Sequence, residues 1–136
     1  MTKTKGCGIA LIKDNKILLG QRVKSEDTLL WSLPGGSIEI GEDNKLGAIR
    51  EVKEECGLDI DEDNIFLIGV DLTKDNIDYT YYCKECFTGS LIAKEDEMIN
   101  FTWFTIEEIF ALKNKGLIYP AASISIDKIL AKNIIE

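Results

Sequence analysis

The amino-acid sequence predicts an α/β sandwich, in which helices pack on a mixed β-sheet. Segments with strand composition alternate along the chain with segments of helical periodicity, which is typical of this class. The length of 136 residues suits one domain, residues 1–136, that is large enough to bury a core. An apolar fraction of 45% and a charged fraction of 29% are typical of a soluble globular protein and argue against disorder.

Four strands are predicted in the first part of the chain. They cover residues 6–12, 16–22, 29–34 and 37–40. The first two form an antiparallel hairpin, because Asp14 and Asn15 between them are turn residues. The third strand ends at Pro34 and the Gly35-Gly36 pair, and the fourth pairs only briefly.

Helices and further strands follow. The predicted helices cover residues 43–56, 106–116 and 123–135, and the predicted strands cover residues 64–73, 77–89 and 99–105. Gly57 and Gly116 end the first two helices, because glycine readily adopts the left-handed conformation of a helix C-cap. An Asp or Asn lies near the N-cap of the first helix.

Charge and hydropathy exclude several kinds of partner. The net charge is −8 and no run of clustered Lys and Arg occurs, so the sequence predicts no binding of polymeric nucleic acid. No apolar run approaches the roughly 20 residues that a membrane helix needs. The apolar stretch from Cys7 to Ile12 is too short for a signal peptide, so a cytoplasmic protein without a membrane partner is expected.

Histidine is absent, and this absence restricts the chemistry. Ser-His-Asp and Cys-His pairs and imidazole metal ligands are excluded, so carboxylates, lysines, tyrosines or cysteines must carry any reaction. Cys83 and Cys86 have CxxC spacing, but an uninterrupted strand over 77–89 would point their sulfurs to opposite sides. That geometry predicts reduced thiols that form neither a zinc site nor a disulfide.

The helix over residues 43–56 carries an unusual concentration of acids. On a helical wheel, Glu51, Glu54 and Glu55 share one face. The apolar residues of the opposite face, which should be buried, are Leu46, Ile49, Val52 and Cys56. A solvated acidic face is one explanation. The other is a Mg²⁺ site, because three carboxylates beside a glycine backbone with accessible carbonyl oxygens offer the hard oxygen ligands that this ion prefers.

The segment from Gly36 to Leu58 resembles the signature of the Nudix hydrolases, Gly-x5-Glu-x7-Arg-Glu-U-x-Glu-Glu-x-Gly-U, where U is a bulky apolar residue. The matching residues are Gly36, Glu42, Arg50, Glu51, Val52, Glu54, Glu55, Gly57 and Leu58. Every fixed position of this Nudix box, residues 36–58, is present. The flanking stretches 29–36 and 97–109 also look like the segments that surround the box in that family.

The resemblance implies a Nudix-type α/β/α sandwich with a mixed β-sheet, and hydrolysis of a nucleoside diphosphate linked to a group X. In such enzymes Mg²⁺, or Mn²⁺ in its place, would be held by the Gly35 carbonyl and by the side chains of Glu51, Glu54, Glu55 and Glu97. Arg50 would orient a glutamate through a salt bridge. The general base would be Glu54 or Glu97, with Glu51 as a third candidate, and the sequence does not choose among them.

The resemblance extends to the MutT-like branch, which cleaves nucleoside or deoxynucleoside triphosphates to a monophosphate and pyrophosphate. ADP-ribose, another nucleotide sugar or a dinucleoside polyphosphate is the alternative substrate, although position 73 is Thr where ADP-ribose enzymes often carry Pro. A non-catalytic nucleotide-sensing module is the alternative of another class. Candidate substrate contacts are Gln21, Arg22, Tyr82 and Phe101. A homodimer is also an expectation.

Overall fold

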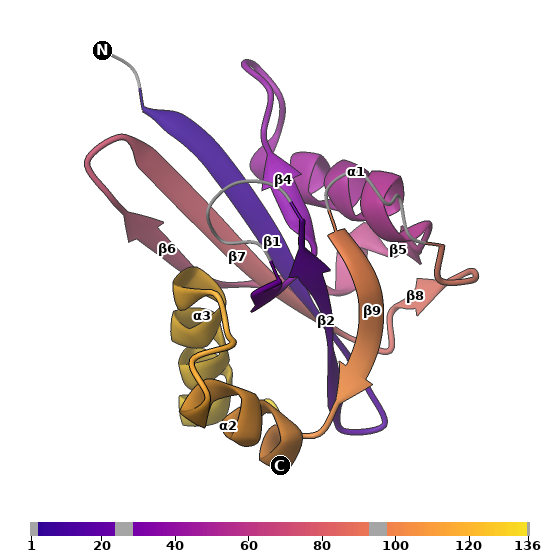
Figure 1. Ribbon diagram of the computed structural model, residues 1–136. Helices are drawn as coiled ribbons and strands as arrows, with labels where there is room; N and C mark the ends of the chain where they lie inside the picture. The colour runs from indigo at the N-terminus through magenta and orange to yellow at the C-terminus, as the bar shows by residue number, and fades with distance from the viewer. Residues whose placement is uncertain (1–2, 24–28, 93–97, 136) are drawn as a thin grey trace.

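The computed structural model describes residues 3–23, 29–92 and 98–135 (Figure 1). The strands are β1 (Thr4–Lys13), β2 (Lys16–Arg22), β3 (Trp31–Ser32), β4 (Gly35–Ser37), β5 (Asp59–Ile60), β6 (Ile65–Leu72), β7 (Asn76–Lys84), β8 (Phe87–Thr88) and β9 (Met98–Phe104). The helices are α1 (Asn44–Cys56), α2 (Ile106–Asn114) and α3 (Pro120–Ala131), with a short 3₁₀ turn at Glu62–Asn64.

Strand β1 organises the main sheet, whose order is β3-β2-β1-β7-β6, with β4 paired to β1 and β9 to β2. Because β1 runs antiparallel to β2 and parallel to β7, the sheet is mixed. Asp14 and Asn15 make the predicted β1–β2 turn with φ of 50° and 60°, the left-handed values that a tight hairpin requires. A separate two-stranded sheet joins β5 to β8.

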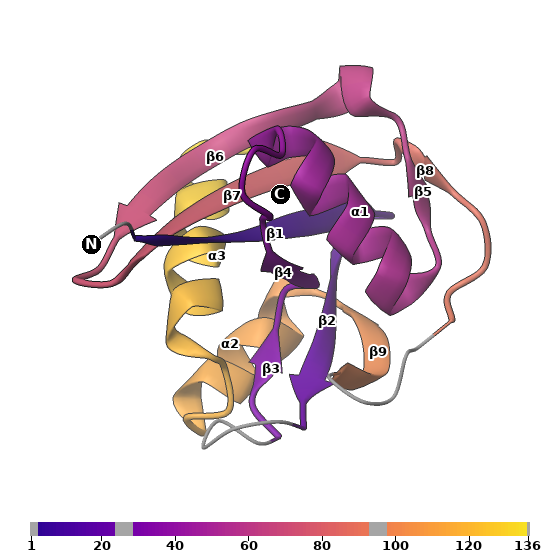
Figure 2. The same cartoon turned by 90° about the horizontal axis from the view of Figure 1, so that it is seen from above.

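Two apolar clusters occupy the two faces of the main sheet. Ile9 and Leu11 of β1 pack with Val52 of α1, whereas the alternate residues Ala10 and Ile12 pack with α2 and α3. The two views show α1 on one side of the sheet and the α2–α3 pair on the other (Figures 1 and 2). The predicted α/β sandwich with a mixed sheet is therefore confirmed.

Several predicted element bounds were wrong. The brief strand beside β1 is the glycine segment Gly35–Ser37 and not residues 37–40, because backbone without side chains can pair closely with β1. The last helix starts three residues earlier than predicted, with Pro120 in its first turn, where a missing N–H costs nothing. No helix among the described segments is long and apolar enough to cross a membrane.

The prediction for the CxxC segment was also wrong. Strand β7 ends at Lys84, and Glu85 adopts a positive φ of 51°, which reverses the chain direction. The strand alternation that would have separated the two sulfurs therefore stops between them. Cys83 and Cys86 form a disulfide with their Cα atoms 5.8 Å apart, whereas Cys7 and Cys56 are free thiols.

Candidate active site

Helix α1 begins and ends where the sequence predicts. The Asp43 side chain accepts a hydrogen bond from the Leu46 N–H at 3.0 Å and is the N-cap. Gly57 closes the helix with φ of 77° and donates its N–H to the Lys53 carbonyl. Both ends of the acidic helix are thus set by local sequence.

The orientation of α1 confirms the helical-wheel prediction only in part, because Val52 and Cys56 are fully buried as predicted but the rest of the wheel is shifted. Leu46, predicted to be buried, is 47% exposed, while Ala48 is fully buried. Glu55 belongs to the acidic set but is only 3% exposed. The helix is therefore rotated, so that the flank carrying Glu55 faces the sheet and the acids line the helix–sheet boundary.

The glycine pair of β4 makes this rotation possible. A side chain at position 36 would collide with the Glu51 carboxylate, and one at position 35 would collide with the backbone of β1. The Gly35 N–H also donates to Glu55 Oε1 at 3.0 Å. The absence of side chains at Gly35 and Gly36 therefore leaves space for the α1 carboxylates. The Gly35 N–H offsets part of the free-energy cost of burying the Glu55 carboxylate.

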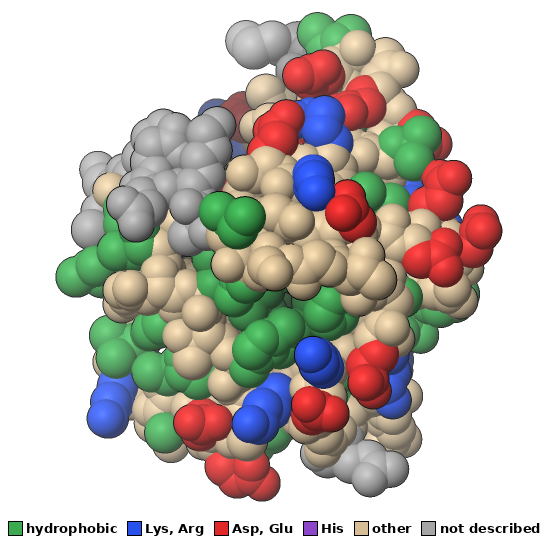
Figure 3. Space-filling view, turned by 90° about the vertical axis from the view of Figure 1, so that its right-hand side faces the viewer, with side chains coloured by type: hydrophobic (Ala, Val, Ile, Leu, Met, Phe, Trp, Pro, Cys, Tyr) green, Lys and Arg blue, Asp and Glu red, His purple; other side chains and the backbone are tan. Residues whose placement is uncertain are grey.

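Arg50 connects the acids of α1 to the loop before the helix. Its Nε and Nη2 donate to the two oxygens of Glu42 at 2.8 and 2.9 Å, a bidentate pair. Its Nη1 donates to Glu51 at 3.0 Å and to Glu54 at 3.2 and 3.3 Å, and Nη2 also reaches the Ser37 carbonyl at 3.0 Å. Acidic and basic side chains are accordingly interleaved over α1 in the space-filling view (Figure 3).

Arg50 also sets the protonation of Glu42. Its hydrogen bonds, joined by one from the Glu39 N–H, lower the pKa of the Glu42 carboxyl from an ordinary 4.5 to about 2. The reciprocal contacts raise the pKa of Arg50, led by the hydrogen bond to Glu42. Glu42 therefore holds the Arg50 side chain in one orientation by two hydrogen bonds. The remaining guanidinium N–H groups orient the carboxylates of Glu51 and Glu54.

We expect Glu42 to contribute stability that depends on pH. Because its folded-state pKa is depressed, that contribution is fully present above 4.5 and is lost as the pH falls towards about 2. The Glu42→Gln variant should therefore melt below wild type at neutral pH, and the gap should close across this window. Thermal melts by circular dichroism against pH measure it. An unchanged gap, or the same pH response with Arg50 replaced by Met, would refute the assignment.

The donor chemistry of this flank fits a hard divalent cation. Glu51, Glu54 and Glu55 supply carboxylate oxygens, and the adjacent glycine backbone supplies carbonyl oxygens. Within residues 3–23, 29–92 and 98–135, however, no three acidic or cysteine side chains are arranged to hold a metal ion. Glu97 lies outside the described residues. The predicted ligand set, including the Gly35 carbonyl and Glu97, stays a prediction.

A cavity of about 320 Å³ lies on the opposite face of the sheet and reaches the same glycine segment. Gly6 and Gly8 of β1 line it, next to Gly35 of β4. A Cβ atom at Gly8 would meet only ordinary contacts at 3.5 and 3.7 Å. Alternating glycines on β1 thus leave the sheet surface bare beneath α3, close to the carboxylates of α1.

Of the four predicted substrate contacts, only Arg22 lines this cavity. Its guanidinium lies 4.2 Å from the centre of the Tyr119 ring, and its buried Nε has no hydrogen-bond partner in the part of the chain that the structure describes. Gln21 instead bonds the Leu29 carbonyl and Asn100. The remaining two candidates, Tyr82 and Phe101, pack against the apolar clusters on opposite faces of the sheet.

Sequence reasoning missed the polar wall of the cavity. Asp78 and Thr80 of β7 and Ser125 of α3 line it, with Ser125 Oγ 3.3 Å from Thr80 Oγ1. Asp78 accepts a hydrogen bond from Asn76 at 2.7 Å. The alternation of Gly6 and Gly8 was the one local signal that this sheet surface is open.

Comparison with known proteins agrees with this fold. A family model described as the NUDIX domain matches residues 2–122 of the chain. The crystal structure of a MutT NUDIX hydrolase from Burkholderia pseudomallei superposes with a TM-score of 0.80 and 24% identity, covering 95% of this chain and 99% of that one. At this identity the likeness shows the fold.

Two curated relatives match shorter stretches of the chain. A MutT-like protein of Streptomyces ambofaciens is 26% identical over 102 residues, which are 75% of this chain and 63% of that protein. An ADP-ribose pyrophosphatase of Methanocaldococcus jannaschii is 48% identical over 46 residues, 34% of this chain and 27% of that protein. The chain thus spans less than two thirds of the length of either relative.

Proposed function

The chain belongs to the NUDIX family, and we propose that it hydrolyses a nucleoside diphosphate linked to a further group. The preferred substrates are nucleoside or deoxynucleoside triphosphates, cleaved to a monophosphate and pyrophosphate. Mg²⁺ is the proposed cofactor, with Mn²⁺ as its substitute. The likeness to a MutT-like protein of Streptomyces ambofaciens supports the MutT-like branch, and this choice of substrate is what the resemblance to that branch implies.

The observation that carries the proposal is the placement of the three α1 carboxylates. They lie along the boundary between the helix and the glycine pair, where Arg50 and the Gly35 N–H hold them by hydrogen bonds. A solvated acidic face would not need Glu55 to be buried at 3% exposure. Burying the Glu55 carboxylate close to Glu51 and Glu54 costs free energy, which the binding of a divalent cation would offset.

Each side chain of the site then has a proposed task. When bound, Mg²⁺ would polarise phosphate oxygens and lower the pKa of an attacking water. Glu54, whose side chain is 49% exposed, is free to accept a proton from that water, while Arg50 keeps its carboxylate oriented. Glu97 remains the second candidate for the base and Glu51 the third.

The cavity beneath α3 is the proposed nucleoside site. It adjoins the glycine segment, so a nucleotide lying in it would place its phosphates near the α1 carboxylates. The Arg22 Nε, which has no hydrogen-bond partner among the described residues, lies at the cavity wall, and the guanidinium would contact a phosphate. Asp78 would accept a hydrogen bond from the sugar or base, and the Ser125 hydroxyl would donate or accept one.

A substrate panel tests the proposal. Purified protein with Mg²⁺ should release pyrophosphate from at least one nucleoside or deoxynucleoside triphosphate, and chelation by EDTA should abolish the release. Preferential cleavage of ADP-ribose to AMP and ribose 5-phosphate would instead favour the activity named for the Methanocaldococcus jannaschii relative. Saturable nucleotide binding without any turnover would identify a sensing module and refute the enzymatic proposal.

A further inference from the structure

The disulfide at the end of β7 lies outside the proposed active site, yet it is connected to the helix that carries the carboxylates. We propose that Cys83–Cys86 is a thiol–disulfide exchange site that reacts with dithiol reductants and whose redox state acts on the C-terminal end of α1. The exchange and its effect on stability do not depend on the proposed hydrolysis, and only the expected change in kcat rests on it.

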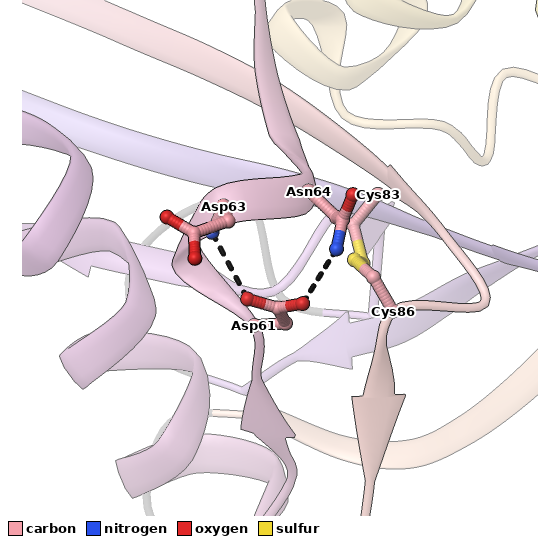
Figure 4. Close-up of a disulfide and its surroundings, with 5 residues drawn as sticks. All are labelled: Asp61, Asp63, Asn64, Cys83 and Cys86. Atoms are coloured by element: carbon pink, nitrogen blue, oxygen red, sulfur yellow. Dashed lines mark hydrogen bonds between the residues drawn. A yellow bond between two sulfur atoms is a disulfide. The ribbon is translucent and has the colours of Figure 1, made fainter.

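The local fold builds the bridge at a sharp turn. Glu85, between the two cysteines, has φ of 51° and donates its N–H to the Ile12 carbonyl of β1 at 2.9 Å. The close-up shows the disulfide beside the 3₁₀ turn, where Asp61 accepts hydrogen bonds from Asp63 and Asn64 (Figure 4). The hydrogen bond from Glu85 to β1 therefore holds the turn that carries the two cysteines against the sheet.

The two cysteines differ in accessibility. Cys83 is fully buried in the apolar cluster beneath α1, whereas Cys86 is partly exposed. Cys86 also lines an open pocket of about 530 Å³ together with Phe66, Tyr82 and Lys84. An incoming thiolate can approach from this pocket, so Cys86 is the sulfur that it attacks.

The exchange balances with a dithiol as the reductant. One thiolate of the dithiol attacks Cys86 Sγ and forms a mixed disulfide, while the bond to Cys83 breaks and Cys83 leaves as a thiolate that takes up a proton. The second thiol of the reductant then attacks the reductant sulfur that is bonded to Cys86 Sγ. This step closes the cyclic disulfide of the reductant and releases Cys86. Two electrons and two protons pass to the protein, and the reductant leaves as a cyclic disulfide.

A short run of contacts connects this bridge to α1. The Cys86 carbonyl accepts a hydrogen bond from the Asp61 N–H at 2.9 Å, and β8, directly after Cys86, pairs with β5, which follows α1. The Phe87 ring of β8 stacks on Trp103 of β9 at 5.6 Å. Hydrophobic side chains gather across the middle of the face that carries β8 and β9 (Figure 3).

These contacts reach the C-terminal turn of helix α1. The Ile92 N–H donates to the Cys56 carbonyl, one of the carbonyls that α1 itself leaves unpaired. Ile92 and Ser90 also lie within 3.2 to 3.3 Å of a Cβ built on Gly57, so they pack against the helix C-cap. Opening the disulfide frees the turn that anchors this segment, and the end of α1 loses part of its support.

The test compares oxidised protein with protein reduced by dithiothreitol and desalted without oxygen. Thiol titration after denaturation should give two thiols in the oxidised form and four in the reduced form, from the four cysteines of the chain. Reduction should lower the melting temperature by about 5 °C, because the cross-link no longer restricts the unfolded chain. It should also lower kcat on the order of tenfold, because small displacements of catalytic groups are costly.

Two variants separate the bridge from other effects. The Cys83→Ser/Cys86→Ser protein should melt like the reduced form and should not respond to dithiothreitol. The Cys7→Ala protein is the control, because it removes a free thiol that is not part of the bridge. Burial raises the pKa of the Cys7 thiol to about 11 and keeps it protonated. This variant should retain the full shift in melting temperature. Equal melting temperatures of oxidised and reduced wild type would overturn the proposal, as would four titratable thiols after treatment with a disulfide oxidant.

Discussion

Replacement of Glu54 by glutamine is expected to lower kcat by about 10³-fold, the loss typical of removing a general base near a metal-activated water. The amide keeps the size of the side chain but can neither accept the proton nor supply a full negative charge. Its pairing with Arg50 is an exposed i,i+4 contact at 3.2 Å, which contributes little to folding. The melting temperature should therefore stay within a few degrees of wild type. Pyrophosphate release at saturating substrate and Mg²⁺ measures the effect.

A matched control makes this loss specific. Glu107 is an exposed glutamate in the first turn of α2, remote in sequence from the acidic helix, and Glu107→Gln should leave kcat unchanged. Binding of Mn²⁺, followed by electron paramagnetic resonance, gives a readout apart from turnover: Glu54→Gln should weaken it and Glu107→Gln should not. Wild-type turnover and Mn²⁺ affinity in Glu54→Gln would remove this residue from both proposed roles.

Much of the fold could be predicted because its signals are local. Asp14 and Asn15 tolerate the left-handed φ values of the β1–β2 turn. Asp43 and Gly57 fix the two ends of α1 through hydrogen bonds that reach only a few residues along the chain. Features of this kind depend on neighbouring residues, so a single sequence is sufficient to locate them.

The rotation of α1 could not be predicted in the same way. A helical wheel assigns the apolar flank to the core, but it does not represent the surface that the helix meets. Here that surface includes Gly35 and Gly36, whose lack of side chains lets the Glu51 and Glu55 flank approach the sheet. The favourable partner of the buried carboxylate is a backbone N–H on another element, and hydropathy patterns contain no information about it.

The CxxC segment and the cavity depend on tertiary structure for similar reasons. The positive φ of Glu85 belongs to a residue that ordinarily avoids this conformation, and the N–H of that residue is satisfied by a distant carbonyl of β1. The cavity brings Arg22, Asp78 and Tyr119 together from β2, β7 and the start of α3. The parallel pairing of β1 with β7 sets Asp78 opposite Gly6 in the cavity wall, and no short motif encodes that pairing.

A side chain added at the wall of the cavity should weaken substrate binding. Gly8→Val should raise KM for the nucleotide by about 100-fold while kcat at saturation stays within a few-fold of wild type, because several apolar contacts and the space for the nucleoside are lost together. A Cβ at position 8 meets the Pro34 carbonyl at 3.5 Å and Leu33 at 3.7 Å, so the side chain fits the strand and extends into the cavity.

This variant should bind the nucleotide more weakly without losing stability. Valine favours the extended conformation of β1 and restricts the unfolded chain more than glycine does, so the melting temperature should rise or remain unchanged. Thr88→Val on the exposed strand β8, outside the cavity, is the matched control and should leave KM unaltered. A wild-type KM in a folded Gly8→Val protein would mean that the nucleoside lies elsewhere. Gly8 and Gly35 are paired residues of β1 and β4, and the Gly35 N–H donates to the Glu55 carboxylate. A fall in kcat with KM unchanged would therefore mean that the substitution at position 8 disturbs Gly35 and Glu55 and leaves nucleotide binding intact.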